Sequence, residues 1–570
     1  MTNNSMLIVI LLLCGFVVKS QDRLSGETFA TRSEVIARNG MAATNHPIAT
    51  QIAIEILKKD GSAVDAAIAA NAFLGFADPA MNGIGGDLFA IIWSAKDKKL
   101  FALNASGRSP MDLSLQYFKE NNIASIPGAG PLGITIPGCV DGWFEMHNKF
   151  GHLPIEDLLA PAISYAKEGI PVAQEIADMM QYLDRSLLKT YTAEGNLGWN
   201  DLPDFNKVYR SAGKFPVKGE IFKNETLANT LQMISDDGRD AFYRGKISKS
   251  IVKHVQNLGG FLSEEDFSNH KSEWLDPVST DYRGYTVWEI PPNGQGVSVL
   301  QMLNILEGYD MSEFGFGSKE HIHYFSEAKK LVYADLGKYY ADPDFNEIPL
   351  EELISKEYAI KRRNEIDPER PKNYGPGLEG QSHTIYLTVA DREGNMVSLI
   401  QSNSWLFGSL VVSPELGFCL QNRGTGFSLE EGHLNSYVPG KRPFHTIIPA
   451  FITKDNLPYV SFGLTGGGMQ PQGHVQIVMN LIDFDMNLQE AGDAPRIRHE
   501  YSHGNPGDGN TGTIRLESGF SYSTIRELLK MGHDVSYGFE RFGGYQAILY
   551  DGSVYYGASE SRKDGQASGY

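Results

Sequence analysis

One threonine, Thr384, stands where a nucleophile for acyl transfer could lie. It follows a polar, glycine-rich tract, residues 372–383 (KNYGPGLEGQSH), which has little to bury and is typical of an exposed loop. A threonine hydroxyl is a weak nucleophile and needs a base within hydrogen-bond reach. A threonine with a free α-amine would carry its own base, because that amine titrates near neutral pH. On residue type alone, ordinary β-propensity is the simpler interpretation of this threonine.

The residues around Thr384 predict the elements that would hold it. Residues 384–390 (TIYLTVA) alternate like a strand, residues 391–395 form a turn, and residues 396–401 form a second strand, which together predict a hairpin. The rest of this half is expected to mix strands and helices. Further strands are predicted at residues 410–412, 417–421 and 446–453, followed by a glycine-rich turn at 463–468 and an apolar run at 475–481.

The first half of the chain is predicted to be largely helical. An apolar segment, residues 52–57, ends at a Lys-Lys-Asp-Gly stop, and residues 64–74 (VDAAIAANAFL) predict a buried, alanine-rich helix. A glycine-rich turn at 83–86 then leads into a buried strand at 88–93. Residues 110–280 are expected to be mostly helical, and residues 321–340 form a further helix that ends before Asp342.

Composition excludes some classes of partner. The chain has 570 residues, 42% of them apolar and 21% charged, which is ordinary for a globular protein. Its length alone would allow up to about four domains. The formal charge of -19 argues against nucleic acid and against an anionic membrane surface as partners.

The N-terminus predicts secretion. Residues 6–18 (MLIVILLLCGFVV) form an apolar run too short to span a bilayer, and Val18 and Ser20 are small residues placed as a signal peptidase prefers. We therefore expect a signal peptide over residues 1–20 and an extracellular protein without a stable membrane anchor. No Lys or Arg precedes the run, so an uncleaved anchor is the alternative interpretation.

In a secreted protein, cysteines can form disulfides and sequons can be glycosylated. Cys14 would leave with the signal peptide, and Cys139 and Cys419 either pair or remain as buried thiols. Asn104 and Asn224 begin Asn-X-Ser/Thr sequons and are predicted glycosylation sites.

Several stretches, taken in order, resemble the γ-glutamyltransferases. They span nearly the whole chain after Ser20, and the ordered set is far more specific than any one of them. The stretches are GMAATNHPIATQIAIEILKKDGSAVDAAIAANAFLGFADPAMNGIGGDLF (40–89), EAKKLVYADLGKYYADPDF (327–345), HTIYLTVADREGNMVSLIQS (383–402), GKRPFHTIIPAF (440–451), LTGGGMQPQGH (464–474), DAPR (493–496) and GASESRKDGQASGY (557–570).

The resemblance implies a fold and a maturation step. The fold is the α+β sandwich of the N-terminal-nucleophile (Ntn) hydrolases, an αββα arrangement of two antiparallel sheets between helical layers. The chain would be made as an inactive proenzyme and cut itself between His383 and Thr384. Residues 21–383 and 384–570 would then be the large and small chains, associated as a heterodimer within one domain.

The resemblance also assigns site residues. Thr384 becomes the nucleophile and Ser402 a hydroxyl that supports it, while the backbone amides of Gly466 and Gly467 stabilise the oxyanion. Arg108 matches an arginine that binds the substrate carboxylate. Thr446 matches one of two adjacent substrate-binding hydroxyls, and His445 replaces the other.

One turn departs from the family pattern. Residues 421–427 read QNRGTGF, so Gly426 stands where a carboxylate would contact the substrate ammonium, and Arg423 lies nearby. A buried ammonium without an anion costs several kcal/mol. The substrate therefore either lacks that ammonium or binds it differently. The sequence is closer to a branch that includes acylases for glutaryl-type amides.

These features predict a secreted, self-processing amidohydrolase or acyltransferase that acts on γ-glutamyl (glutathione-type) or related acyl amides. The alternative is a processed secreted protein, such as a venom or gland component, that acts mainly by binding cell surfaces or proteins. No nucleotide cofactor is expected, because residues 83–86 are too short for a phosphate loop. A metal is not expected either, because the chain has no HExxH motif or Cys/His cluster, and His321 and His323 would face different sides of their helix.

Overall fold

The computed structural model describes residues 26–191, 197–375, 377–378, 382–500, 509–539 and 542–570. The predicted signal peptide lies outside the described residues, as does part of the tract before Thr384.

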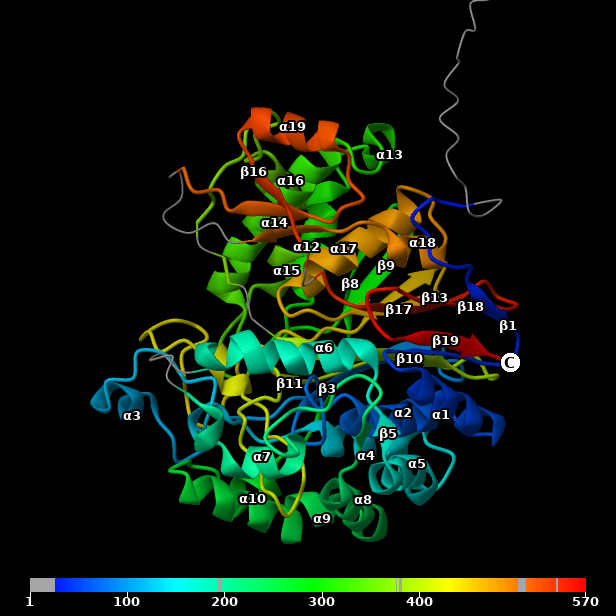
Figure 1. Cartoon of the computed structure of the whole chain (residues 1–570). Helices are drawn as coiled ribbons and strands as arrows, with labels where there is room; N and C mark the ends of the chain where they lie inside the picture. Colours follow the sequence, from blue (N-terminus) through cyan, green and yellow to red (C-terminus); the bar gives the residue numbers. More distant parts are fainter. Residues whose placement is uncertain (1–25, 192–196, 376, 379–381, 501–508, 540–541) are drawn as a thin grey trace, which may run out of the picture.

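Two seven-stranded antiparallel sheets lie face to face at the centre of the molecule (Figure 1). Each sheet contains strands from both halves of the chain. In spatial order, the first sheet contains β1 (Val35–Ala37), β18 (Tyr555–Ser559), β17 (Tyr545–Tyr550), β13 (Leu457–Leu464), β12 (Ala450–Lys454), β9 (Tyr285–Glu289) and β8 (Val278–Tyr282). The second contains β19 (Gln566–Gly569), β2 (Met41–Thr44), β10 (His383–Ala390), β11 (Met396–Ser404), β3 (Asp87–Ser94), β4 (Lys99–Ala105) and β7 (Glu273–Leu275).

The side chains between the sheets form an apolar core that also contains a few hydroxyl groups, each with a hydrogen-bond partner. Phe89, Tyr386 and Phe451 belong to this core and are fully buried. The hydroxyl groups of Thr388 on β10 and Ser461 on β13 lie 2.7 Å apart, so they join the two sheets directly. Alternate residues of β10 therefore face the opposite sheet, as the period of two along a strand requires.

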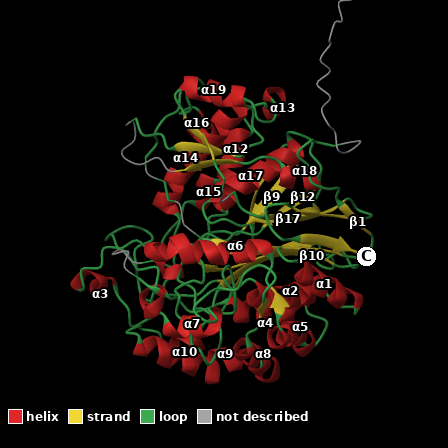
Figure 2. Cartoon of the chain, in the orientation of Figure 1, coloured by secondary structure: helices red, strands yellow, loops and turns green. Residues whose placement is uncertain are grey.

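Helices cover the outer face of each sheet, which confirms the four-layer αββα arrangement (Figure 2). The alanine-rich α2 lies against β10 and β11 and is buried along almost all of its length, because small side chains allow close approach. On that side lie α1 (Pro47–Lys58), α2 (Ala63–Ala77), α4 (Cys139–Phe150), α5 (Ile155–Glu168) and α8 (Glu225–Asp237); on the other lie α12 (Val297–Leu306), α14 (Lys319–Tyr339), α17 (Met469–Ile482) and α18 (Leu488–Asp493).

The other helices and strands lie at the periphery of the two sheets. They are α3 (Leu115–Glu120), α6 (Gln174–Tyr182), α7 (Pro203–Tyr209), α9 (Arg239–Tyr243), α10 (Lys246–Asn257), α11 (Glu264–Asn269), α13 (Met311–Phe314), α15 (Leu350–Leu353), α16 (Lys356–Arg363) and α19 (Tyr522–Met531), the pair β5 (Ile170–Pro171) and β6 (Ile221–Phe222), and a small sheet of β14 (Ile497–Glu500), β15 (Thr513–Leu516) and β16 (Asp534–Tyr537).

The predicted hairpin at Thr384 is confirmed, since β10 pairs antiparallel with β11. Three strand predictions are wrong in whole or part. Residues 410–412 and 417–421 form only an isolated bridge between Val412 and Cys419, in a segment with glycines at positive φ. The strand expected from residue 446 begins only at Ala450. The backbone before Ala450 bonds outside the sheet instead, since Ile448 donates to the side chain of Gln470 on the helix of residues 469–482.

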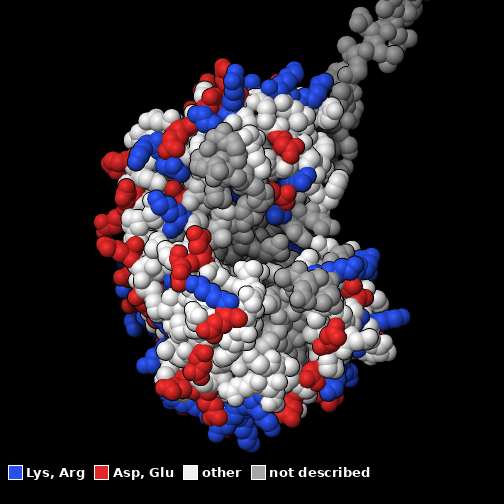
Figure 3. Space-filling view, turned by 90° about the vertical axis from the view of Figure 1, so that its left-hand side faces the viewer, with Lys and Arg blue, Asp and Glu red and all other residues white. Residues whose placement is uncertain are grey.

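Acidic and basic side chains are interspersed over the face shown in Figure 3. Within the part of the chain that the structure describes, no helix has the length and apolarity needed to cross a membrane.

Candidate active site

Thr384 is the second residue of β10 and lies at an irregularity in its pairing with β11. The register shifts between His383 and Ile385, and the Thr384 side chain is only 2% exposed. Its hydroxyl oxygen lies 3.4 Å from the Ser382 hydroxyl, which in turn lies 3.3 Å from that of Ser402. The predicted nucleophile is thus held on a rigid strand among other hydroxyl groups.

The peptide bond before Thr384 has a hydrogen-bond donor on its carbonyl. The Ser402 hydroxyl, on β11, donates to the His383 carbonyl oxygen at 2.6 Å. The Ser402 oxygen itself accepts the Ser404 N–H at 2.7 Å. A donor in this place would stabilise negative charge developing on the His383 oxygen if the carbonyl carbon were attacked.

A buried guanidinium group, that of Arg423, lies behind Ser402. Its Nη2 donates to the Ser402 oxygen at 3.0 Å and its Nη1 donates to the Thr446 hydroxyl at 2.7 Å. Arg423 is 2% exposed, its Nε has no partner, and it forms no ion pair within 4 Å among the described residues. Burial lowers its pKa to about 10, and the charge of Asp87 opposes that change.

Asp87 and His445 form a buried pair beside this arginine. Asp87, the first residue of β3, lies 3.1 Å from His445 Nε2 and accepts the N–H groups of Gly107 and Gly138. Burial raises the pKa of Asp87 to about 7, although Arg423 lowers it. Burial and the charge of Arg423 hold the pKa of His445 well below its ordinary value, so the imidazole is neutral. His445 therefore supports Asp87 and is fully buried.

The glycine pair lies at the N-terminus of α17. Gly466 and Gly467 have φ values of 116° and 60°, which only glycine adopts without strain. The Gln295 amide donates to the carbonyl oxygens of Thr446 (2.6 Å) and Gly467 (2.9 Å). It thereby links the glycine turn to Thr446, whose hydroxyl accepts a hydrogen bond from Arg423. Within the described ranges, neither glycine N–H donates to a protein acceptor. Free N–H groups at a helix N-terminus favour a developing anion.

These groups together suit acyl transfer. The site combines the hydroxyl of the predicted nucleophile, a donor on the adjacent carbonyl, a buried cation and free backbone amides. The comparisons then decide the family, because the gamma-glutamyltranspeptidase family model matches residues 49–570. The chain belongs to the gamma-glutamyltranspeptidase family.

Members of this family resemble the chain over nearly its full length. The glutathione hydrolase-like YwrD proenzyme of Bacillus subtilis (strain 168) is 36% identical over 551 residues, covering 94% of this chain and 99% of the relative. The acylase ACY 1 proenzyme of Pseudomonas sp. (strain SE83) is 33% identical, covering 92% of each chain. The crystal structure of cephalosporin acylase from Bacillus halodurans has a TM-score of 0.87 and 39% identity, covering 96% and 99%. The chain is therefore a glutathione hydrolase-like enzyme with the Ntn-hydrolase fold.

Arg108, the predicted carboxylate-binding residue, is held by acidic groups of the protein itself. Its guanidinium pairs with Glu273 (3.1 Å), Asp342 (3.2 Å) and Asp344 (2.6 Å). These carboxylates raise its pKa against the effect of burial. A substrate carboxylate would have to compete with them, whereas among the described residues no carboxylate lies within ion-pair distance of Arg423, on which Asp87 acts from farther away.

Both sequon asparagines are buried in this fold, and glycosylation at Asn104 and Asn224 stays a prediction. Asn104 is 3% exposed and its amide nitrogen donates to the Asn293 side chain. Asn224 is 5% exposed, caps α8, and donates to the Gly417 carbonyl. Attachment of a sugar to either amide nitrogen would require that hydrogen bond to break. Cys139 and Cys419, whose pairing the sequence left open, are both free buried thiols.

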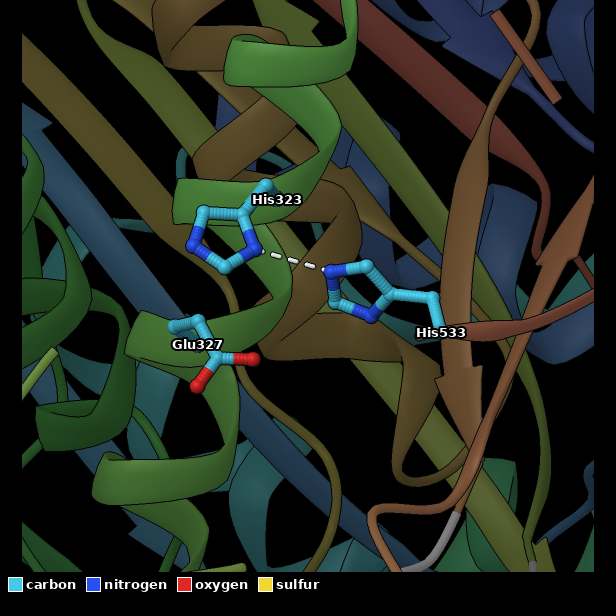
Figure 4. A group of neighbouring side chains, drawn as sticks. All are labelled: His323, Glu327 and His533. Atoms are coloured by element: carbon cyan, nitrogen blue, oxygen red, sulfur yellow. Dashed lines mark hydrogen bonds between the residues drawn. The ribbon is translucent and has the colours of Figure 1, made fainter. Parts of the chain in front are cut away.

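One group of possible metal ligands lies outside this site. His323 and Glu327, one turn apart on α14, meet His533, and the two histidine rings bond to each other at 2.8 Å (Figure 4). Protein partners already bind these groups: the Asp367 carbonyl holds His323, and Lys330 and Tyr374 hold Glu327. Tyr374 belongs to the tract before Thr384, so this network anchors that tract to α14.

Sequence reasoning missed several residues that the fold brings to the site. Ser382 touches Thr384, Asp87 faces Arg423, and Gln295 reaches the glycine turn. Asp87 lies inside the IGGDLF stretch that carried the family resemblance, which was the one available signal. Nothing in the local pattern around Gln295 connects it with a turn more than 150 residues away.

Proposed function

We propose that this enzyme is a secreted, self-processing amidohydrolase or acyltransferase whose acyl substrate carries a carboxylate. It cuts its own chain before Thr384 and then uses Thr384 to cleave small acyl amides. The buried, unpaired Arg423 beside the nucleophile is the observation that carries the proposal.

The geometry at His383 supports self-cleavage. The Thr384 hydroxyl attacks the His383 carbonyl carbon, the peptide C–N bond breaks, and the resulting ester is hydrolysed by water. The products are a carboxylate on His383 and a free α-amine on Thr384. Ser402 stabilises the oxyanion of this step, and Arg423 makes the Ser402 hydroxyl a stronger donor by binding its oxygen. Two relatives carry the word proenzyme in their names, which supports maturation of this kind.

Substrate recognition by Arg423 follows from charge. A buried guanidinium without a carboxylate partner is costly, and an anionic ligand would relieve that cost. The planar guanidinium suits a carboxylate, and its unpartnered Nε is available. An ammonium-binding acid is missing at Gly426, where an added Cβ would lie 2.6 Å from the Phe444 carbonyl oxygen. The site therefore favours glutaryl-type acyl groups over γ-glutamyl groups.

The two chains stay together after the cut because each sheet mixes strands from both. On the second sheet β10 lies between β11 and β2, and β19 pairs with β2. Cleavage before Thr384 removes no strand from either sheet. We propose a heterodimer of residues 21–383 and 384–570, exported through the apolar run at residues 6–18.

The test compares three 4-nitroanilides, glutaryl, γ-glutamyl and butyryl, with the purified secreted protein, after N-terminal sequencing of its bands. We expect termini near Gln21 and at Thr384, and the highest kcat/KM for the glutaryl substrate. Arg423→Leu, assayed as its cleaved fraction, should lower kcat/KM for glutaryl about 100-fold or more and change the butyryl rate far less. A butyryl rate equal to the glutaryl rate would contradict the acyl specificity, and an uncut chain would contradict the enzyme mechanism.

A further inference from the structure

A narrow pocket opens beside Thr384, at the N-terminal end of β10. Its volume is about 10 Å³, close to the space that one water molecule or one ammonium group needs. Its polar lining comes from five parts of the chain. The lining includes Thr384, Asn45, Asp78, Glu175, Lys563 and Asp564.

Asp78 is the unusual member of this pocket. It follows α2 directly, is 6% exposed, and its Oδ1 is buried without a hydrogen-bond partner. Burial raises its pKa to about 7; Lys563 lowers the value, and Glu175 and Asp564 raise it. Asp78 thus places a carboxyl group that still holds a proton in part near pH 7 in the same pocket as the predicted nucleophile.

The other charged groups of the pocket are already engaged. Lys563 pairs with Glu175 at 2.6 Å. Asp564 accepts the backbone N–H of Glu175 at 2.8 Å. Asp78 is therefore the group in this pocket with a free acceptor atom and no ion partner within 4 Å among the described residues.

Resting on the self-cleavage proposed above, we propose that Asp78 is a positioning residue that becomes the counter-ion of the Thr384 α-amine when the chain is cut. Cleavage converts a neutral amide nitrogen into an amine within reach of this pocket. A proton then passes from the Asp78 carboxyl group to the amine, giving a carboxylate and an ammonium without bringing net charge into the pocket. Asp78 holds the amine in place and sets the pH at which it becomes a free base.

Electrostatics decides in which direction Asp78 changes the pKa of the Thr384 α-amine. A carboxylate close to an amine favours the ammonium form and raises the amine pKa. The two groups titrate as a pair, so the acid limb of kcat/KM reports both. Removing the carboxylate should shift that limb to lower pH.

The experiment measures kcat/KM against pH for the cleaved enzyme and three variants. Asp78→Asn keeps the side-chain shape, and we expect its acid limb to move down by about one pH unit. Asp78→Glu should keep the wild-type limb. Asp455→Asn, at an exposed turn where φ is already 52°, removes one charge far from the pocket and should also leave the limb in place.

If Asp78→Asn has too little activity for a kcat/KM profile, a second measurement replaces that profile. The pH dependence of acylation of the Thr384 amine by acetic anhydride, followed by mass spectrometry, gives the amine pKa directly. An amine pKa that is equal in wild type and Asp78→Asn would overturn this inference. Absence of an N-terminus at Thr384 would instead overturn the proposed function, so the two failures are distinguishable.

Discussion

The Ser402 hydroxyl donates a 2.6 Å hydrogen bond to the carbonyl oxygen of His383, the residue directly before Thr384. The bond joins two neighbouring strands at the point where their register shifts. It places a donor on the one carbonyl that self-cleavage would attack, before any cut has been made.

Ser402→Ala should slow self-cleavage about 10²–10³-fold, because it removes one donor from the oxyanion. The measurement is the rate at which the two chains appear on a denaturing gel after synthesis. Ser398→Ala is the matched control, since Ser398 is a buried serine on the same strand whose hydroxyl bonds to Tyr386 instead. Equal cleavage rates in the two variants would show that the His383 contact is incidental.

Thr384→Ala should leave a single uncut chain, because no hydroxyl remains to attack the His383 carbonyl. Thr384→Ser keeps a hydroxyl and should still be cut. Mass spectrometry of the purified proteins distinguishes these outcomes. Two chains divided at the same bond in the alanine variant would remove Thr384 from the mechanism.

Gly426→Asp, which would restore an acid at the family position, should destabilise this protein and not improve γ-glutamyl turnover. The added Cβ would meet the Phe444 carbonyl at 2.6 Å, and such overpacking costs about 1–3 kcal/mol. Urea unfolding in the uncut Thr384→Ala background measures the cost. Gly509→Asp, where a Cβ meets nothing within 4 Å, is the control. A stable Gly426→Asp enzyme with faster γ-glutamyl hydrolysis would show that the missing acid alone limits recognition.

Acid should destabilise the fold through buried histidines such as His321. Burial lowers the pKa of His321 to about 3, whereas the unfolded chain binds the proton near pH 6.5. The free energy of unfolding therefore falls by about 1.4 kcal/mol per pH unit as pH drops from about 6.5 towards 3. His321→Phe, whose ring would pack against Phe484, should remove that part of the slope. Parallel stability curves for the two proteins between pH 6.5 and 4 would contradict the expectation.

Local pattern was enough for the elements with strong periodicity. The run at residues 64–74 is rich in alanine and almost wholly apolar, which predicts a buried helix, and it forms most of α2. The alternation after Thr384 became β10 in the expected hairpin. Residues 475–481 were ambiguous because a short apolar run fits a buried strand or a buried helix, and packing made them part of α17.

The sequence by itself determined the family, the αββα fold and the identity of the candidate nucleophile, because ordered motifs and periodic apolar residues are properties of the chain alone. Only the tertiary structure decided which charges are free. In the fold, Arg108 pairs with three acidic side chains, whereas Arg423 has no such partner within 4 Å among the described residues. Both sequons are buried, and Asp78 lines a pocket together with Thr384. The physical reason is that burial and pairing depend on contacts between residues hundreds of positions apart, which no local pattern records.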